Sequence, residues 1–193
     1  SLPVNSMREL AALTNQKPGA LSYGSAGIGS ATHLQMEILL RDIGGVKMLH
    51  VPYKGINDIV RALAAGEIQI GSSAALLSVG PARAGQIRPL AVVGGQRDRE
   101  FSDVPTMREA GYPEAAGSII WFGFALPAKT PRAIVDRMAA DLARVSNEPA
   151  QKQVLDKTGW EPMLFGPEPF RELIQRERAL IAKVVAEMGL KPE

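Results

Sequence analysis

A loop rich in glycine and serine carries the clearest chemical signal in the sequence. Gly24, Gly27 and Gly29 alternate with small residues, and Ser30 stands just before an amphipathic run that ends near Ile43. Glycine adopts positive φ and allows close backbone approach, and serine is a good helix cap. A helix start presents unpaired N–H groups and partial positive charge. The loop is therefore predicted to bind an anion, with a tight packing turn as the alternative.

Three well-known glycine motifs fit this loop less well. The Walker motif ends in Gly-Lys-Ser/Thr, a tripeptide that the chain lacks. The dinucleotide-binding pattern would meet Thr32 where its third glycine belongs. The esterase elbow around Ser25 would need glycine in place of Tyr23. These departures favour a simpler anion over a nucleotide and count against a serine esterase.

The two histidines are the other candidates for chemistry. A serine hydrolase would place Ser25 or Ser30 beside His33, which lies about one turn into the expected helix. His33 could equally hydrogen-bond a ligand or the loop itself. With Glu37 it makes an i,i+4 pair, which we interpret as a surface pair, because two ligands alone make no metal site. His50 is expected to be a structural strand residue with one satisfied nitrogen.

Two further turns follow expected strands. Lys54, in the turn Val51–Gly55, could pair with an anion or be a solvated turn residue. Ser72 and Ser73 follow a short strand, where they could present hydroxyls to a ligand or simply cap the next helix. Because α/β sheets bind ligands beyond the carboxyl ends of their strands, both turns are expected near the glycine loop.

Strands and helices alternate along most of the chain, which predicts an α/β fold with a mainly parallel sheet flanked by helices. The first four expected strands should form one sheet, with the ends at Ser25, Pro52 and Gly71 at one rim. These strands are Leu21–Gly24, Val46–Val51, Ile68–Ile70 and Ile87–Val93, and later strands are expected at Ile119–Leu126 and Glu161–Leu164. Helices are expected near residues 5–14, 30–43, 57–65, 73–85, 130–145, 147–157 and 167–188, with one helical turn at 106–110.

Composition limits the classes of function. Of 193 residues, 22 are basic and 20 acidic, and this balance without a basic cluster argues against a nucleic-acid partner. The absence of cysteine excludes disulfides, zinc-thiolate sites and a thiol nucleophile. No apolar run reaches transmembrane length, so no membrane-spanning segment is predicted. No metal or cofactor is predicted either. Residues 1–9 do not resemble a signal peptide, and we expect a mature, processed or truncated chain.

Together these motifs resemble the Bug (TctC-like) family, the extracytoplasmic solute receptors of tripartite tricarboxylate transporters. The resemblance starts with the segments Tyr23–His33 and His50–Gly55. It continues in the expected order through Asp103–Thr106, Glu109–Gly111, Trp121–Gly123 and Pro127–Pro131, and so covers nearly the whole chain.

The resemblance implies a type II periplasmic binding protein fold, with two domains that close on a ligand. It implies that residues 1–118 are the complete second domain and residues 119–193 the C-terminal portion of the first domain. The first domain is then incomplete, because the family's opening strand and Pro-Gly-Gly-rich loop are not in this sequence. The chain would associate with itself through that incomplete domain.

The function implied is that of a bacterial periplasmic receptor, without catalytic activity, for small di- or tricarboxylates. Such a receptor delivers its ligand to the membrane permease subunits of the transporter. Two alternatives stay open: a ligand-dependent sensory module that binds a partner protein, and a serine hydrolase.

The resemblance also assigns ligand-binding residues. One carboxylate would be held by the backbone N–H groups and hydroxyls of Ser25, Ala26, Gly27, Ile28, Gly29 and Ser30. We add His33, Lys54 and Ser73 to this set. Many family members carry an aromatic residue followed by Asp-Asn where this chain has Ser72-Ser73-Ala74. The lack of that Asp argues against an amino-acid ligand and predicts a roomier pocket.

Overall fold

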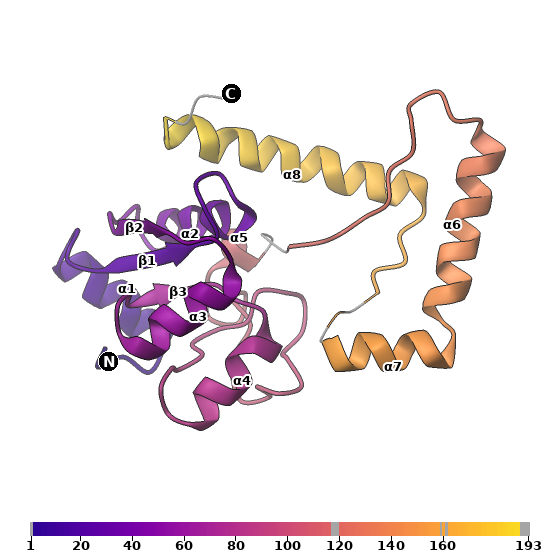
Figure 1. Ribbon diagram of the computed structural model, residues 1–193. Helices are drawn as coiled ribbons and strands as arrows, with labels where there is room; N and C mark the ends of the chain where they lie inside the picture. The colour runs from indigo at the N-terminus through magenta and orange to yellow at the C-terminus, as the bar shows by residue number, and fades with distance from the viewer. Residues whose placement is uncertain (1, 117–119, 159, 161, 190–193) are drawn as a thin grey trace. The chain divides into compact units, whose positions relative to one another are not determined.

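The computed structural model describes residues 2–116, 120–158, 160 and 162–189. The chain divides into two compact units, Ser1–Ile120 with Val184–Glu193, and Trp121–Lys183 (Figure 1). Each unit is described by itself.

The first unit is built on a three-stranded parallel sheet. Its strands are β1 (Ser22–Ser25), β2 (Leu49–Pro52) and β3 (Ile70–Gly71), in the order β2-β1-β3. In the register, Ser25 lies opposite Pro52 and Gly24 lies opposite Gly71. The prediction that the ends of these three strands share one rim is confirmed. β1 is central, so the loop that follows it lies between the ends of its two neighbours.

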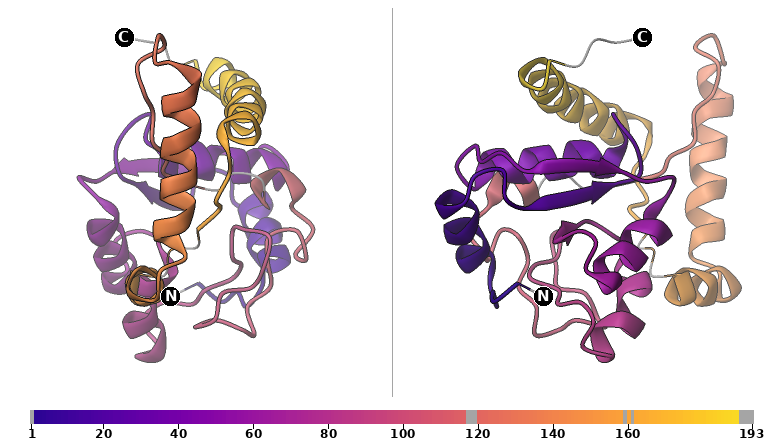
Figure 2. Two further views of the ribbon diagram at one scale, coloured as in Figure 1. Left: turned by 90° about the vertical axis from the view of Figure 1, so that its right-hand side faces the viewer. Right: turned by 60° about the vertical axis from the view of Figure 1, so that its left-hand side comes forward.

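Helices cover both faces of this sheet (Figure 2). The helices of this unit are α1 (Met7–Gln16), α2 (Ala31–Asp42), α3 (Ile56–Ala65), α4 (Ala75–Arg83) and the short α5 (Pro113–Ala116). Successive strand side chains point to opposite faces. Tyr23 accordingly contacts the α2 residue Glu37, whereas the Cα of Gly24 faces Ile59 of α3. Thus α2 and α3 lie on opposite faces of β1.

A pair of glycines lets α3 approach the sheet closely. A Cβ added to Gly24 would lie 2.5 Å from Ile68 Cδ1 and 3.3 Å from Ile59 Cγ2. A Cβ added to Gly71, its register partner, would lie 2.7 Å from Ile59 Cγ2 and 3.1 Å from Leu63 Cδ1. Ile59, Ala62 and Ile68 form a buried cluster at this contact. The side chains on this face, Ile59 and Leu63 of α3 and Ile68, therefore pack directly against the backbone of the two glycines.

The second unit contains α6 (Arg132–Ser146), α7 (Pro149–Thr158) and most of α8 (Pro167–Glu187). None of the α6 residues, all of which the structure describes, is buried. Its packing centres on aromatic rings: Trp121 and Phe170 make an edge contact at 5.0 Å, and Phe122 and Trp160 make another at 4.8 Å. Phe122 is nevertheless 78% exposed. This unit has a sparse core.

The expected helices are present, with ends shifted by a few residues, and the strands differ more. Residues 87–93 form no regular strand, and Val92 makes only an isolated parallel bridge to Thr106. The reason is Pro89, which lacks an N–H for a ladder. The described parts of 119–126 and 161–164 are not strands either, whereas Ile119 and Glu161 lie outside the described residues. Within the described chain, no helix combines the length and apolar character needed to cross a membrane.

Candidate functional site

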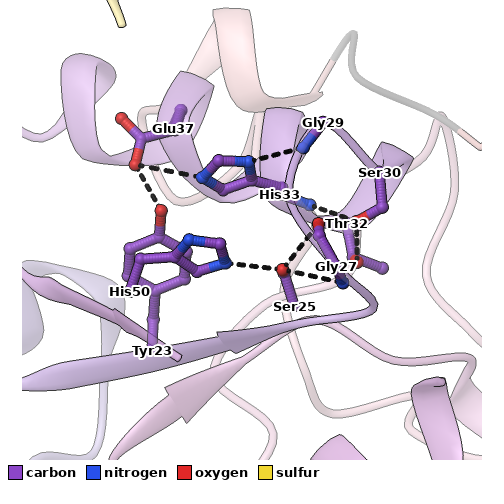
Figure 3. A network of polar contacts seen from close by, with 9 residues as sticks. All are labelled: Tyr23, Ser25, Gly27, Gly29, Ser30, Thr32, His33, Glu37 and His50. Carbon is purple, nitrogen blue, oxygen red and sulfur yellow. Dashed lines mark hydrogen bonds and ion pairs between the residues drawn. The ribbon is translucent and has the colours of Figure 1, made fainter. Parts of the chain in front are cut away.

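The loop Ser25–Ser30, hereafter the anion loop, joins β1 to α2 (Figure 3). Gly27 has φ 117° and Gly29 has φ 73°, conformations that side chains disfavour. A Cβ on Gly29 would meet nothing within 4 Å, so glycine serves the backbone conformation there and not space. Ser30 is the N-cap of α2 and accepts a hydrogen bond from His33 N at 3.3 Å. The anion loop therefore has the conformation and the helix start predicted from the sequence.

Side chains of Ser25 and of the first turn of α2 hold the anion loop in place. Ser25 Oγ accepts from Gly27 N at 3.2 Å and lies 3.0 Å from Gly27 O. Ala26 N donates to Thr32 Oγ1 at 2.8 Å, and Gly29 N donates to His33 Nδ1 at 3.0 Å. Several backbone amides of the loop are thus oriented by the protein itself.

Three N–H groups at this turn have no hydrogen-bond partner among the described residues. They are those of Ile28, Ala31 and Thr32. Ala31 and Thr32 open α2, whose first N–H groups cannot bond within the helix. Ile28 is 70% exposed at the loop tip. These donors, with the positive end of the α2 dipole, form an arrangement suited to a carboxylate.

A stack of three rings lies beside the anion loop (Figure 3). Tyr23 of β1 stacks on His50 of β2 with centroids 4.9 Å apart, and His50 stacks on His33 of α2 at 3.8 Å and 10°. Tyr23 is fully buried and His33 is 4% exposed. Because Tyr23 and His50 are register partners, the stack follows from the pairing of β1 with β2.

Polar groups connect the stack to the loop and to α2. His50 Nε2 lies 2.6 Å from Ser25 Oγ. Tyr23 Oη donates to Glu37, whose carboxylate is 4.0 Å from His33 Nε2. The prediction of a surface His33–Glu37 pair is therefore wrong, because the face of α2 that carries both residues packs on the sheet. His50 has one nitrogen satisfied within a strand, as expected.

Burial sets the ionisation of these rings. It lowers the pKa of His33 below its ordinary value of 6.5, and the Glu37 carboxylate opposes that shift. The pKa of His50 is also lowered, first by burial and then by His33, again against Glu37. Burial and the Glu37 carboxylate raise the pKa of the Tyr23 phenol. Near neutral pH both imidazoles are therefore uncharged and the phenol keeps its proton.

The structure brings together part of the predicted ligand-binding set. Hydrogen bonds link Ser25, Ala26, Gly27, Gly29, Ser30 and His33 to one another or to Thr32, and Ile28 lies between them at the tip.

Lys54 and Ser73 are not joined to this network by the contacts described. Lys54 lines a hollow of about 530 Å³ that no anion-loop residue lines; the others are Pro52, Tyr53, Asp58, Arg61, Ala62 and Glu67. Ser73 Oγ lies 2.6 Å from Ser78 Oγ, and the neighbouring Ser72 donates to Gln35 of α2. The predicted helix start at Ser72 or Ser73 is shifted, because α4 has Ala74 as its N-cap.

Sequence reasoning missed Tyr23, Thr32, Glu37 and His50 as parts of one network. The available signal was alternation along β1: Tyr23 and Ser25 share a face, which is the face of α2. No group of three or more His, Asp or Glu side chains suited to a metal ion occurs in the described part of the chain.

Comparison with known proteins gives a consistent result. The sequence model of a family described as "Tripartite tricarboxylate transporter family receptor" matches residues 1–190. The chain is 31% identical to Protein BugT of Bordetella pertussis over 193 residues, which is 98% of this chain and 58% of that protein.

Solved structures are similar as well. One is an R. palustris protein with adipate, at 33% identity and a TM-score of 0.78, covering 100% of this chain and 64% of that one. Another is MatC from Rhodopseudomonas palustris with bound malate, at 25% identity and a TM-score of 0.70, covering 95% and 63%. The chain therefore spans less than two thirds of the length of these proteins.

Proposed function

We propose that this chain, which belongs to the tripartite tricarboxylate transporter receptor family, is a periplasmic receptor, or part of one, for small carboxylates. Its α/β fold, a parallel sheet flanked by helices, is that of periplasmic binding proteins. The family match over residues 1–190 is the observation that carries the proposal.

The proposed ligands are di- or tricarboxylates. Structural relatives were solved with adipate and with malate, both of which carry two carboxylates. The anion loop supports this class because its donors are backbone N–H groups at a helix start, which suit an anionic oxygen without requiring a charged side chain. We propose that the loop Ser25–Ser30 holds one carboxylate, that His33 contributes by orienting Gly29, and that Lys54 and Ser73 line the rest of the site.

The whole receptor would work with partners. We propose that residues 1–118 act as the second lobe of a two-lobed binding protein and residues 119–193 as the returning part of the first lobe. The receptor would pass its ligand to membrane permease subunits of a tripartite transporter. Copies of this chain would associate through the sparsely packed second unit, where Phe122 and Phe124 are 78% and 73% exposed.

We also propose that the chain does not act as a serine hydrolase. The pairing in the structure is Ser25 with His50 and not with His33. Ser25 is fully buried, and its hydroxyl contacts Gly27 as well as His50. A nucleophile must be reachable by a substrate carbonyl, which this serine is not. We expect Ser25→Ala to hydrolyse p-nitrophenyl acetate at the same rate as wild type. A rate that Ser25→Ala abolishes would contradict this proposal.

The binding proposal is tested by NMR titration of the ¹⁵N-labelled chain with adipate, malate and citrate, which detects even millimolar affinity. The amides of residues 26–32 should shift on addition of at least one of these. Gly29→Val should weaken binding roughly a hundredfold or more, because two charge-assisted hydrogen bonds of about 1.5–3 kcal/mol each would be misdirected.

Lys54→Ala is the matched control. Its exposed ammonium should contribute about 1 kcal/mol or less. If Lys54→Ala abolishes binding and Gly29→Val leaves it intact, the hollow beside Lys54 is the site and the anion loop is not.

A further inference from the structure

The hydrogen bond between Gly29 and His33 constrains the protonation of the imidazole. Gly29 N–H donates to His33 Nδ1 at 3.0 Å. A ring nitrogen accepts a hydrogen bond only while it carries no proton. Protonated His33 would therefore set an N–H against an N–H, and the left-handed turn at Gly29 would lose the partner that orients it.

His50 acts on the other end of the anion loop through Ser25. The Ser25 hydroxyl has one proton and three neighbours: His50 Nε2 at 2.6 Å, Gly27 N at 3.2 Å and Gly27 O at 3.0 Å. When His50 Nε2 carries a proton and donates it to Ser25 Oγ, as in one neutral tautomer and in the cation, the hydroxyl can donate to Gly27 O and accept from Gly27 N. His33 is thus one hydrogen bond from a glycine with positive φ, Gly29, and His50 is two hydrogen bonds from another, Gly27.

The two histidines form one unit because their rings stack. Their centroids are 3.8 Å apart at 10°, so a positive charge on one disfavours a positive charge on the other. The groups that face them are Tyr23 from β1, which is stacked on His50, and Glu37 from α2, whose carboxylate lies 4.0 Å from His33. Nothing else that is titratable contacts the pair among the described interactions.

We infer that His33 and His50 are positioning residues for the carboxylate-binding shape of the anion loop, and that His33 holds this shape only while its ring is neutral. This inference rests on the carboxylate binding proposed above. It assigns the histidines to the loop and not to the ligand, and it predicts a specific sign. Acid should weaken binding, whereas a histidine that touches the carboxylate directly would strengthen it by becoming a cation.

Amide variants separate positioning from simple packing. His33→Asn places an amide oxygen near the position of Nδ1 and cannot titrate, and His50→Gln does the same for Nε2. His33→Leu and His50→Leu keep bulk and remove the polar atom. At pH 7.5, the adipate or malate affinity of the amide variants should stay within about threefold of wild type, and each leucine variant should lose about tenfold, the equivalent of one hydrogen bond.

The pH profile is the second measurement. As pH falls from 7.5 to below the lowered pKa of His33, the wild-type affinity should fall by up to about tenfold more than that of the His33→Asn/His50→Gln double variant, the equivalent of the lost hydrogen bond from Gly29. Protonation of adipate or malate affects both proteins equally, so the comparison cancels it.

A ligand-free measurement keeps the inference testable if the leucine variants do not fold. In wild type, the Gly29 amide resonance should move with pH along the same curve as the His33 ring resonances, and in His33→Asn it should not move. A Gly29 resonance that ignores the His33 titration, or equal affinities and pH profiles for all variants, would overturn the positioning roles. If wild type binds none of the carboxylates while Gly29 still follows His33, carboxylate binding fails as the function and the coupling between ring and loop is supported.

Discussion

At the scale of single residues, the anion loop depends on backbone conformations that glycine adopts without strain. Gly29 and the distant Gly19 have almost the same φ, 73° and 74°, and neither has a neighbour within 4 Å of an added Cβ. Each glycine-to-alanine change should cost about 1–2 kcal/mol of stability, because a left-handed residue pays that much for its Cβ. Only Gly29→Ala should also weaken carboxylate binding.

Urea denaturation and NMR titration of the two variants check this prediction. Gly19→Ala is the control for strain alone, since Gly19 donates its N–H to Lys47 O and lies in the turn before β1. Equal loss of binding in both variants would mean that general destabilisation, and not loop geometry, controls affinity.

The buried histidines should make stability depend on pH. Their pKa values in the folded chain lie below the ordinary 6.5. Between the folded and unfolded pKa values the unfolded state binds more protons, so stability is complete above about pH 6.5 and declines as pH falls through that window. The urea midpoint should therefore fall between pH 7.5 and pH 5, and fall less in His33→Asn/His50→Gln.

If the urea midpoint of the double variant falls with pH as much as that of wild type, the pH dependence comes from carboxylates elsewhere in the chain and not from the histidines. The comparison at fixed pH removes the contribution of groups that both proteins share.

Features that depend on adjacent residues could be predicted from the sequence, whereas contacts between residues far apart in the chain could not. The glycine spacing and the Ser30 cap, read from adjacent residues, predicted a loop that the structure has. The stack of His50 on His33 depends on how β2 pairs with β1, which no short stretch of sequence records. The same gap explains why the His33–Glu37 pair was predicted to lie on the surface.

At the scale of elements, the docking of α3 on the sheet is the most sharply constrained contact. Gly71→Ala should destabilise the chain by about 1–3 kcal/mol, because its Cβ would overlap the Cγ2 of buried Ile59, which sits on a short branched stem. Gly95→Ala, which meets nothing within 4 Å and has no positive φ, should change stability by less than about 0.5 kcal/mol.

A double-variant cycle tests the cause. Ile59→Leu removes the Cγ2 branch and keeps the volume, so its effect combined with Gly71→Ala should be smaller than the sum of the two. Additive effects, measured by thermal or urea unfolding, would show that the Gly71 substitution acts through something other than Ile59.

Elements were predictable where periodicity was strong. The long apolar stripe at 167–188 predicted α8 to within one residue, and cap residues marked α1 and α2. Apolar runs alone were weaker guides. Residues 87–93 looked like a buried strand, but Pro89 breaks the donor ladder and Arg88 donates its guanidinium to Val4 O instead. An apolar run is also consistent with a half-buried loop, which is what this segment forms.

At the scale of the whole molecule, the two units differ in how well they are filled. The unit Ser1–Ile120 with Val184–Glu193 contains nearly all of the buried apolar residues, whereas Trp121–Lys183 leaves Phe122, Phe124 and Trp160 exposed. Apolar surface of this kind favours association. We expect sedimentation velocity to show self-association that increases with concentration.

Amide exchange should show the same contrast. Amides of α6 and α7 should exchange faster than those of β1 and α2, because local opening costs least where few apolar contacts are broken. Slow exchange throughout α6 and α7 would contradict this prediction, and a monomer at all concentrations would contradict the proposed association.

Of the properties of the whole chain, its family was the one that the sequence identified most completely. The order of its motifs along the chain led to the family that the sequence model matches over residues 1–190. The assignment of residues 1–118 and 119–193 to two lobes stays a prediction. The compact units instead group the end of α8, from Val184, with the first unit.

The ring stack also bears on how this sequence can change over evolutionary time. Tyr23, His33 and His50 come from three elements, yet each ring presents a flat face that only another ring fills well. A substitution at one of them leaves its neighbours poorly packed and leaves a polar atom without its hydrogen-bond partner. Tolerated substitutions should therefore occur together with compensating changes at the other positions. Substitutions at positions 23, 25, 33, 37 and 50 should therefore be correlated among relatives, although up to 27 positions separate these residues in the chain.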